Sequence, residues 1–386
     1  MTQRTFHNEY AGPRRQIQSG LANAALIIAC LLMNLAEISV VSAKSTIPSN
    51  AGSDTGAVGA QVAARVTSFT LDKELASLDF SPDGNHLALA EWVGSKVHIK
   101  SWRGTDASEK VFAITAGSAL FSRQSGLTFS PDGLHLAIAH APDKSDGYGV
   151  IRLWNVQSGE VSHEIKEPSR SGLRNCIEFA SDGKLLYRSF DGRRTDSGDQ
   201  FFVYDTNSWN LVWSLRTSPF IPVSMDISPN GKWAVLGGSV VENNQLTSRL
   251  VFVDLERHTV INQAGASPLS GEIKLVKWSP DSSRVVTVLI NDPRVPPLPN
   301  IVTLEALSGK TLATESGAGD IDSVVFTPDG RYIIEAHATG PIVIWNSSHS
   351  SQLQEIPIQH SRLAISRDGH YLAIASLLSL SIWHFN

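Results

Sequence analysis

A short turn phrase recurs seven times along the chain and constrains the fold more than any other feature. Its most regular form is Ser-Pro-Asp-Gly, and successive copies begin 49, 50, 48, 51, 48 and 39 residues apart. The copies are Ser81–Gly84, Ser130–Gly133, Ala180–Gly183, Ser228–Gly231, Ser279–Ser282, Thr327–Gly330 and Ser366–Gly369. Self-similarity at a period of this length indicates a repeat architecture, in which each unit buries its apolar faces against its neighbours.

Each copy has the chemistry of a tight turn between two strands. Proline presets the first backbone angle, the aspartate side chain bonds its own backbone, and glycine accepts a positive φ. An apolar strand such as Leu87–Ala90 follows the turn, and a third strand rich in β-branched and aromatic residues comes next, as at Ile151–Trp154. Four short strands per unit, repeated seven times, predict an all-β, seven-bladed β-propeller with four-stranded antiparallel blades.

The run from Leu127 to Glu160 resembles a blade of the WD-repeat family. It contains Phe-Ser-Pro-Asp-Gly, Ile-Arg-Leu-Trp-Asn and a closing Ser-Gly-Glu turn. The family's Gly-His pair is absent, and its Trp-Asp ending is Trp-Asn at Trp154 and Trp345, so the resemblance does not extend to the family's His-Asp-Trp support. The resemblance covers residues 65–386 and implies that an N-terminal strand, here Arg65 to Leu71, completes the last blade beside the strand that ends at Phe385.

The first 43 residues have the pattern of an export signal. A basic region containing Arg14 and Arg15 precedes an apolar run from Leu21 to Ala36, and Val41-Ser42-Ala43 ends in small residues. We therefore predict a signal peptide at residues 1–43, cleaved after Ala43, and a location in the periplasm or outside the cell. Residues 44–64 are small and polar and are predicted to be a flexible linker before the propeller at 65–386.

Three other interpretations of the N-terminus stay open. The apolar run could remain as a membrane anchor that leaves the propeller facing outside. Ile27-Ile28-Ala29-Cys30 resembles a lipobox, which would put a lipid on Cys30, and Arg14-Arg15 resembles a twin-arginine signal. An uncleaved anchor or a lipid would be the chain's only expected link to a membrane.

The composition and the missing motifs narrow the class of function. The formal net charge is -5 and the isoelectric point is about 6.2, so no basic excess favours nucleic acid. Cys176 would be the lone cysteine of the mature chain, which leaves neither an internal disulfide nor a cysteine metal cluster. No phosphate-binding glycine loop, nucleophile elbow or zinc-protease motif occurs. We expect no cofactor and assign neither a catalytic residue nor a metal ligand.

Long connections indicate where a partner would bind. In WD-repeat propellers the turn phrases lie on one face, and the loops between the second and third strands of each blade lie on the other. Here these loops are long at 141–149, 191–200, 239–249 and 291–300. Because binding residues concentrate on variable loops of a rigid scaffold, this is the expected partner face. The candidate binding residues are Asp143, Asp146, Tyr148, Arg193, Arg194, Arg249 and Arg294.

A second candidate site lies two residues before each turn phrase, on the innermost strands. The seven residues there are Asp79, Thr128, Glu178, Asp226, Lys277, Val325 and Ala364. If their side chains reach the central channel, Asp79, Glu178 and Asp226 form an acidic arc with Lys277 beside it. Such an arc could bind a cation, or it could be a set of hydrated or ion-paired channel residues.

Two functions of different class follow. The first is an exported, non-catalytic scaffold that binds a protein or peptide across its long loops. This function rests on the family resemblance, because a fold alone does not define a function. The second is a secreted propeller enzyme, similar to lactonase-like hydrolases, with a cation held in the channel by the acidic arc.

Overall fold

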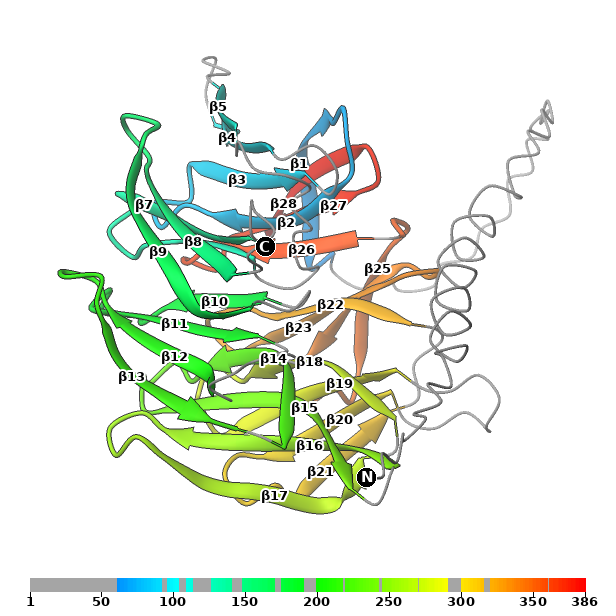
Figure 1. Cartoon of the computed structure of the whole chain (residues 1–386). Helices are drawn as coiled ribbons and strands as arrows, with labels where there is room; N and C mark the ends of the chain where they lie inside the picture. Colours follow the sequence, from blue (N-terminus) through cyan, green and yellow to red (C-terminus); the bar gives the residue numbers. More distant parts are fainter. Residues whose placement is uncertain are drawn as a thin grey trace, which may run out of the picture. The chain divides into compact units, whose positions relative to one another are not determined.

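The described part of the chain belongs to the compact unit Val58–Asn386. The computed structural model describes residues 61–91, 96–103, 109–113, 126–140, 148–170, 175–190, 199–217, 219–242, 245–269, 271–290, 300–315, 320–359 and 361–386. These residues form seven separate four-stranded antiparallel sheets, which are the blades of a β-propeller (Figure 1). The predicted fold class is confirmed. The signal peptide and most of the linker lie outside the described residues and remain predictions.

The blades follow one another along the chain, each from its inner to its outer strand. Blade 1 contains β2 (Leu75–Phe80), β3 (His86–Glu91), β4 (Lys96–Ser101) and β5 (Glu109–Ala113); blade 2 contains β6 (Leu127–Phe129), β7 (His135–His140), β8 (Tyr148–Asn155) and β9 (Val161–Arg170); blade 3 contains β10 (Asn175–Phe179), β11 (Leu185–Phe190), β12 (Asp199–Asp205) and β13 (Leu211–Arg216). Blade 4 contains β14 (Phe220–Ile227), β15 (Trp233–Glu242), β16 (Gln245–Asp254) and β17 (Thr259–Leu269); blade 5 contains β18 (Glu272–Trp278), β19 (Arg284–Ile290), β20 (Ile301–Glu305) and β21 (Thr311–Glu315); blade 6 contains β22 (Ile321–Phe326), β23 (Tyr332–His337), β24 (Ile342–Asn346) and β25 (Gln352–Ile356).

Blade 7 is closed by the two ends of the described chain. It contains β26 (Ser361–Ile365), β27 (Tyr371–Ser376), β28 (Ser379–Phe385) and, as its outer strand, β1 (Ala63–Thr70). The pairing runs from Ala63 opposite Phe385 to Thr70 opposite Ser379, and blue β1 lies beside red β28 in Figure 1. The predicted ring closure is therefore confirmed, with a strand that begins two residues before the predicted Arg65.

The turn phrases are built as the sequence predicts, and they also join the blades. The hydroxyl of Ser81 donates to Oδ1 of Asp83 at 2.5 Å and accepts the backbone N–H of His86 at 2.9 Å, while Gly84 has φ of 68°. The phrases also pack on one another: a Cβ placed on Gly133 would lie 3.6 Å from Cδ of Pro82 in the preceding blade. The phrases thus form a packed ring at one end of the molecule.

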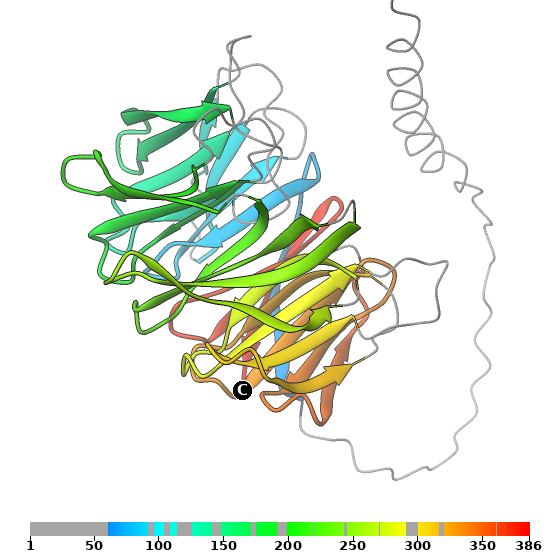
Figure 2. The ribbon, with the colours of Figure 1, turned by 60° about the horizontal axis from the view of Figure 1, so that its bottom comes forward.

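The hydrophobic core lies between the blades, on both faces of each sheet. Phe201 and Phe202 are consecutive on β12, and both are fully buried. Because neighbouring strand residues point to opposite faces, Phe201 packs with the residues of blade 4 and Phe202 with those of blade 2. Figure 2 shows the successive blades in a second orientation, with the colours following the chain around the ring.

One segment that the sequence predicts to be a loop instead extends strands β15 and β16. The connection predicted at 239–249 is largely paired, because β15 and β16 continue to the pair Glu242 and Gln245. The prediction of a long loop in blade 4 was wrong, since the β-branched run Val240-Val241 extends the ladder instead of ending it.

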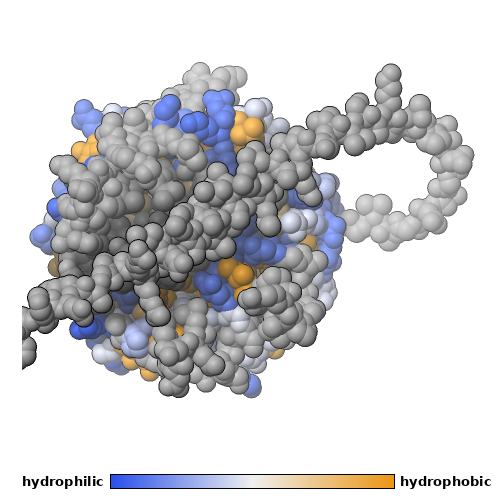
Figure 3. Space-filling model, turned by 45° about the vertical axis from the view of Figure 1, so that its right-hand side comes forward, coloured by the Kyte–Doolittle hydropathy of each residue, from blue (hydrophilic) through white to orange (hydrophobic). Residues whose placement is uncertain are grey.

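Where described residues are visible in Figure 3, they are mostly hydrophilic, with small, separate hydrophobic spots. The described residues also contain no helix long and apolar enough to cross a membrane.

Candidate functional site

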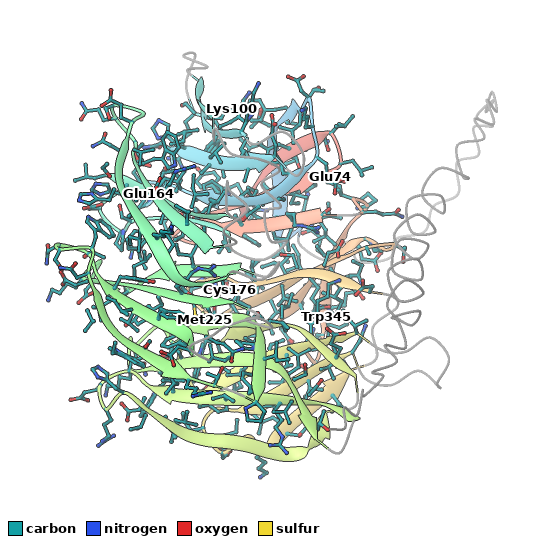
Figure 4. All side chains as sticks on the ribbon, viewed as in Figure 1. Glu74, Lys100, Glu164, Cys176, Met225 and Trp345 are labelled. Atoms are coloured by element: carbon teal, nitrogen blue, oxygen red, sulfur yellow. The ribbon has the colours of Figure 1, made fainter. Side chains whose placement is uncertain are left out.

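The centre of the ring holds a cavity of about 290 Å³ that is lined by all seven inner strands. Figure 4 marks two of these strands by Cys176 on β10 and Met225 on β14. The lining combines polar residues such as Ser77, Ser224 and Ser323 with charged residues and with apolar residues such as Leu78, Ile177 and Met225. The cavity is thus mixed in polarity, close in size to the smallest ligand pockets, and framed by rigid strands.

The predicted channel residues meet at this cavity. Asp79, Glu178 and Lys277 line it directly, together with the neutral Thr128, Val325 and Ala364 from the same level of the other inner strands. Asp226 is buried beside Lys277 and binds its ammonium group through Oδ1. The structure thus places Asp79, Glu178 and Lys277 at the channel, whereas Asp226 lies beside Lys277 and outside the lining.

The three carboxylates perform a role that their positions in the sequence did not indicate. Each accepts a backbone N–H from the inner strand of the next blade. Oδ2 of Asp79 lies 3.0 Å from N of Phe129. Oε2 of Glu178 lies 3.3 Å from N of Ile227, and Oδ2 of Asp226 lies 2.7 Å from N of Trp278. These hydrogen bonds connect successive blades around the channel, and a hydrogen bond to an ionised carboxylate is stronger than a neutral one.

Burial controls the protonation of this arc. Surrounding protein raises the pKa of Asp79 to about 6, although N–H groups of Phe129 and Phe80 oppose the rise. Burial, together with the neighbouring charge of Asp226, raises the pKa of Glu178 to about 8. Burial also disfavours the charge on Lys277, but Asp226 and Glu178 outweigh it and hold the pKa of this lysine above its ordinary value. At neutral pH, Glu178 is therefore largely protonated, and Asp226 is the main counter-charge of Lys277.

A second charged group in the cavity was missed at the sequence level. Nζ of Lys274 lies 3.1 Å from Oδ1 of Asp322, and Nη1 of Arg362 lies 3.3 Å from Oδ2 of the same carboxylate. These residues come from the inner strands of blades 5, 6 and 7. Burial raises and the two cations lower the pKa of Asp322, and the net shift is downward. Asp322 and Arg362 line the same cavity as Asp79 and Glu178.

The strand geometry explains why this group was missed. Lys274 and Asp322 occupy positions where β18 and β22 bulge, between Ile273 and Leu275 and between Ile321 and Ser323. A bulge inserts one residue and shifts the alternation of side chains, so counting back from the turn phrase fails there. Arg362 lies two residues before Ala364 on β26, and alternation along that strand could have identified it.

Arg367 lies across the turn-phrase end of the ring. It replaces proline in the blade 7 phrase, and its guanidinium donates to the carbonyl of Pro131 at 3.3 Å and to that of Ser181 at 3.4 Å. These carbonyls belong to the turn phrases of blades 2 and 3, neither of which neighbours blade 7 in the ring. The side chain therefore spans the ring of turns at this end of the channel.

Most of the predicted partner-face residues lie outside the described residues, namely Asp143, Asp146, Arg193, Arg194 and Arg294. Tyr148 is the first residue of β8. Arg249 lies within β16, opposite Gly238, and is partly exposed. Arg249 is thus a strand residue and not the loop residue that the sequence suggested.

Comparison with known proteins supports the fold at a coarse level. No family model and no curated protein matches the chain. The chain is similar in structure to hydrazine synthase of Kuenenia stuttgartiensis, with a TM-score of 0.65 and 18% identity over 81% of this chain and 96% of that chain. It is also similar to a chain of the mitotic checkpoint complex, with a TM-score of 0.63 and 18% identity over 90% of this chain and 99% of that chain. At this identity the likeness shows the class of protein alone, a seven-bladed β-propeller.

Proposed function

We propose that the chain is an exported WD-repeat-like scaffold that binds a protein or peptide through its long-loop face. The observation that carries this proposal is the asymmetry between the two ends of the ring. At one end the turn phrases are short and packed glycine against proline. By contrast, residues 141–147, 191–198 and 291–300 separate the second and third strands of blades 2, 3 and 5 along the chain, whereas only Leu377 and Leu378 do so in blade 7. Variable connections on a rigid frame are the usual place for recognition.

A protein partner also agrees with one structural neighbour, which is a component of an assembly, the mitotic checkpoint complex. The candidate contact residues are mainly basic, including Arg193, Arg194 and Arg294, with Asp143, Asp146 and Tyr148 in the neighbouring blade. Arginine and tyrosine are enriched among residues that dominate binding energy at interfaces.

The experiment compares two faces of one molecule. The mature chain from Lys44 is used to capture partners from the envelope extract of its source, and the captured protein is then titrated against purified variants. Replacing Arg193, Arg194 and Arg294 by Glu should weaken binding at least tenfold. The matched control, Lys232→Glu beside the blade 4 turn phrase, should leave binding unchanged. Equal effects of the two changes would refute a partner face on the long loops.

Export is tested separately. Mass spectrometry of the protein from its native source should find an N-terminus near Lys44. An intact N-terminus or a lipid on Cys30 would instead support an anchored protein facing outside.

The second candidate function is a hydrolase that holds a cation in the channel. Only the unpaired charge of the acidic arc favours this function. Asp79 has no ion pair among the described residues, which would suit a cation. However, each carboxylate of the arc already uses one oxygen on a backbone N–H, and the described residues hold no group of His, Cys, Asp and Glu arranged for a metal. Millimolar calcium or zinc should raise the melting temperature if this candidate is correct, because binding stabilises the native state.

A further inference from the structure

The inner strands place a further level of side chains in the central cavity, four residues before each turn phrase. In blades 6, 7 and 1 the residues at this level are Ser323, Arg362 and Ser77, and each pairs with an alanine of the second strand. Side chains two positions apart share one face of a strand, so Ser77 points into the cavity as Asp79 does. All of these residues line the cavity, and their strands β22, β26 and β2 lie side by side.

Arg362 brings a buried cation to this level. It is 8% exposed, and the equivalent residue in each of the other six blades is uncharged. Its Nη1 lies 3.3 Å from Oδ2 of Asp322 and 3.5 Å from the carbonyl oxygen of Ser361, whereas its Nε is buried without a hydrogen-bond partner. A guanidinium carries five N–H donors in a planar fork that matches a carboxylate. One edge of the Arg362 guanidinium is therefore left to bind a second carboxylate through two parallel hydrogen bonds.

Asp322 satisfies only part of the charge on Arg362, because it is shared with a second cation. Its Oδ1 lies 3.1 Å from Nζ of Lys274, and its Oδ2 faces Arg362. Lys274 also contacts the half-exposed Asp320 at 2.8 Å. The carboxylate of Asp322 thus lies between two basic groups, and Arg362 keeps an attraction for an anionic group in the cavity.

The Ser77 hydroxyl lies at the same level as Arg362 in the next blade. Ser77 is 7% exposed, and its side chain makes no hydrogen bond within the described part of the chain. A buried hydroxyl without a partner reduces stability, so a polar ligand that bonds to it gains affinity. The hydroxyl provides one more donor for a carboxylate held by Arg362.

Asp79 offers the opposite charge two positions farther along β2. Two residues of a strand span about 7 Å, which separates this carboxylate from the level of Ser77. Oδ2 of Asp79 accepts the N–H of Phe129 at 3.0 Å, but the carboxylate forms no ion pair with a described residue. Burial raises the pKa of Asp79 to about 6, so the group is mainly ionised above pH 7. The neighbouring blades 7 and 1 thus present an unsatisfied cation and an unpaired anion to one cavity.

The buried charges around the cavity are balanced when Glu178 is protonated. Three cations then face three ionised carboxylates, namely Lys274, Lys277 and Arg362 against Asp79, Asp226 and Asp322. A ligand with a net charge would leave one buried charge uncompensated, which is costly. A ligand that carries one charge of each sign keeps the balance.

We propose that the central cavity binds a small zwitterion, with its carboxylate held by Arg362 and Ser77 and its ammonium group held by Asp79. The cavity volume of about 290 Å³ is enough for a short amino acid. The separation of the two levels favours an amino acid whose charged groups are joined by several methylene groups. This site does not involve the long-loop face, so it can be present or absent whatever binds there.

Isothermal titration calorimetry of the full-length protein tests the site with three probes of similar carbon skeleton. 4-Aminobutanoate carries both charges, butanoate carries only the carboxylate, and butylammonium carries only the ammonium group. 4-Aminobutanoate should bind once per chain. Each of the other probes should bind at least about tenfold more weakly, because each lacks one charge-assisted contact.

Two variants assign the two ends of the ligand. Arg362→Lys keeps a positive charge beside Asp322 but cannot form two parallel hydrogen bonds. It should weaken 4-aminobutanoate and butanoate by about tenfold and leave butylammonium unchanged. Asp79→Asn can still accept the N–H of Phe129, and it should weaken 4-aminobutanoate and butylammonium by about tenfold and leave butanoate unchanged. Arg65→Lys, which changes an exposed arginine of β1, is the matched control and should alter none of the three affinities.

Three results would overturn the zwitterion site. The first is no binding of 4-aminobutanoate, and the second is a single-charge probe that binds as tightly as 4-aminobutanoate, which for butylammonium would indicate a simple cation site. The third is an equal effect of Arg362→Lys on butanoate and butylammonium. If Arg362→Lys does not fold, Ser77→Ala removes one hydroxyl and takes its place. It should weaken 4-aminobutanoate and butanoate by about threefold or more and leave butylammonium unchanged, and equal affinities in Ser77→Ala and wild type would overturn the site.

Discussion

The carboxylate of Asp226 on β14 binds the ammonium of Lys277 on β18, and its second oxygen accepts the backbone N–H of the next residue, Trp278. One buried side chain thereby neutralises a channel cation and also fixes the inner strand of the next blade. A polar group in this position is stable only while all of these partners are present. The charged residues of the channel consequently act first as structural elements.

Asp226→Ala should destabilise the protein by about 3–5 kcal/mol, because it leaves Lys277 as an uncompensated buried cation and Trp278 N–H without an acceptor. Urea denaturation followed by tryptophan fluorescence measures this loss. The control is the double variant Asp226→Ala with Lys277→Met, which removes both charges and should recover a large part of the stability. A loss below about 1 kcal/mol in the single variant would contradict the structural role of the pair.

Glu178→Gln should alter the pH dependence of stability. The folded-state pKa of Glu178 is raised from 4.5 to about 8. Its stabilising contribution is therefore complete below pH 4.5 and is lost as the pH rises towards 8. Glutamine can still accept the N–H of Ile227 and never ionises. The variant should gain on the order of 2 kcal/mol over the wild type between pH 5 and pH 8, measured by denaturation at each pH. Parallel pH profiles for the two proteins would show that Glu178 does not titrate in this range.

The fold could be predicted because its signal is local and repeated. Ser81, Asp83 and Gly84 act within one turn, and their hydrogen bonds need no distant partner. The closure of the last blade by β1 was implied by the resemblance to WD-repeat blades, and the pairing of β1 with β28 confirms it. The bulges at Lys274 and Asp322 could not be predicted from the sequence, because they depend on how each inner strand fits its neighbour in the ring.

For the candidate site residues, too, the sequence predicts some features and not others. The channel positions of Asp79, Glu178 and Lys277 followed from strand register alone. Their role in binding the next blade's backbone depends on the spacing between blades, which no sequence pattern reports. Arg367 was visible in the sequence as a departure from proline, but its partners Pro131 and Ser181 lie 236 and 186 residues away along the chain.

Gly237 and Gly238 are adjacent on β15, and adding a methyl group should reduce the stability of the protein by different amounts at the two positions. A Cβ on Gly238 would lie 2.1 Å from the backbone oxygen of Ile221, whereas a Cβ on Gly237 would lie 2.5 Å from Cγ1 of Val276. A side chain can move to relieve such a contact, whereas the backbone cannot. Gly238→Ala should therefore destabilise the protein by about 3 kcal/mol or more, and Gly237→Ala by about 1–3 kcal/mol. Thermal denaturation of both variants provides the comparison.

The matched control is Val276→Ala, which clears space for Gly237→Ala only. In combination it should partly restore Gly237→Ala and leave Gly238→Ala unchanged, a coupling that a double-mutant cycle measures. Equal rescue of both variants would contradict the close backbone approach between β14 and β15.

Deleting residues 63–70 should open blade 7. The deletion removes β1, exposes the edge of β28 and leaves the apolar side chain of Phe385 without the residues of Ala63–Thr70 that cover this strand. An unpaired edge is a template for pairing with another chain, so we expect a loss of several kcal/mol together with aggregation. Light scattering and the melting temperature report the two effects. Val66→Ser is the matched control, because Val66 is 54% exposed and its replacement leaves the backbone of β1 paired. If the deletion variant melts at the same temperature as Val66→Ser and stays monomeric, β1 does not close the ring.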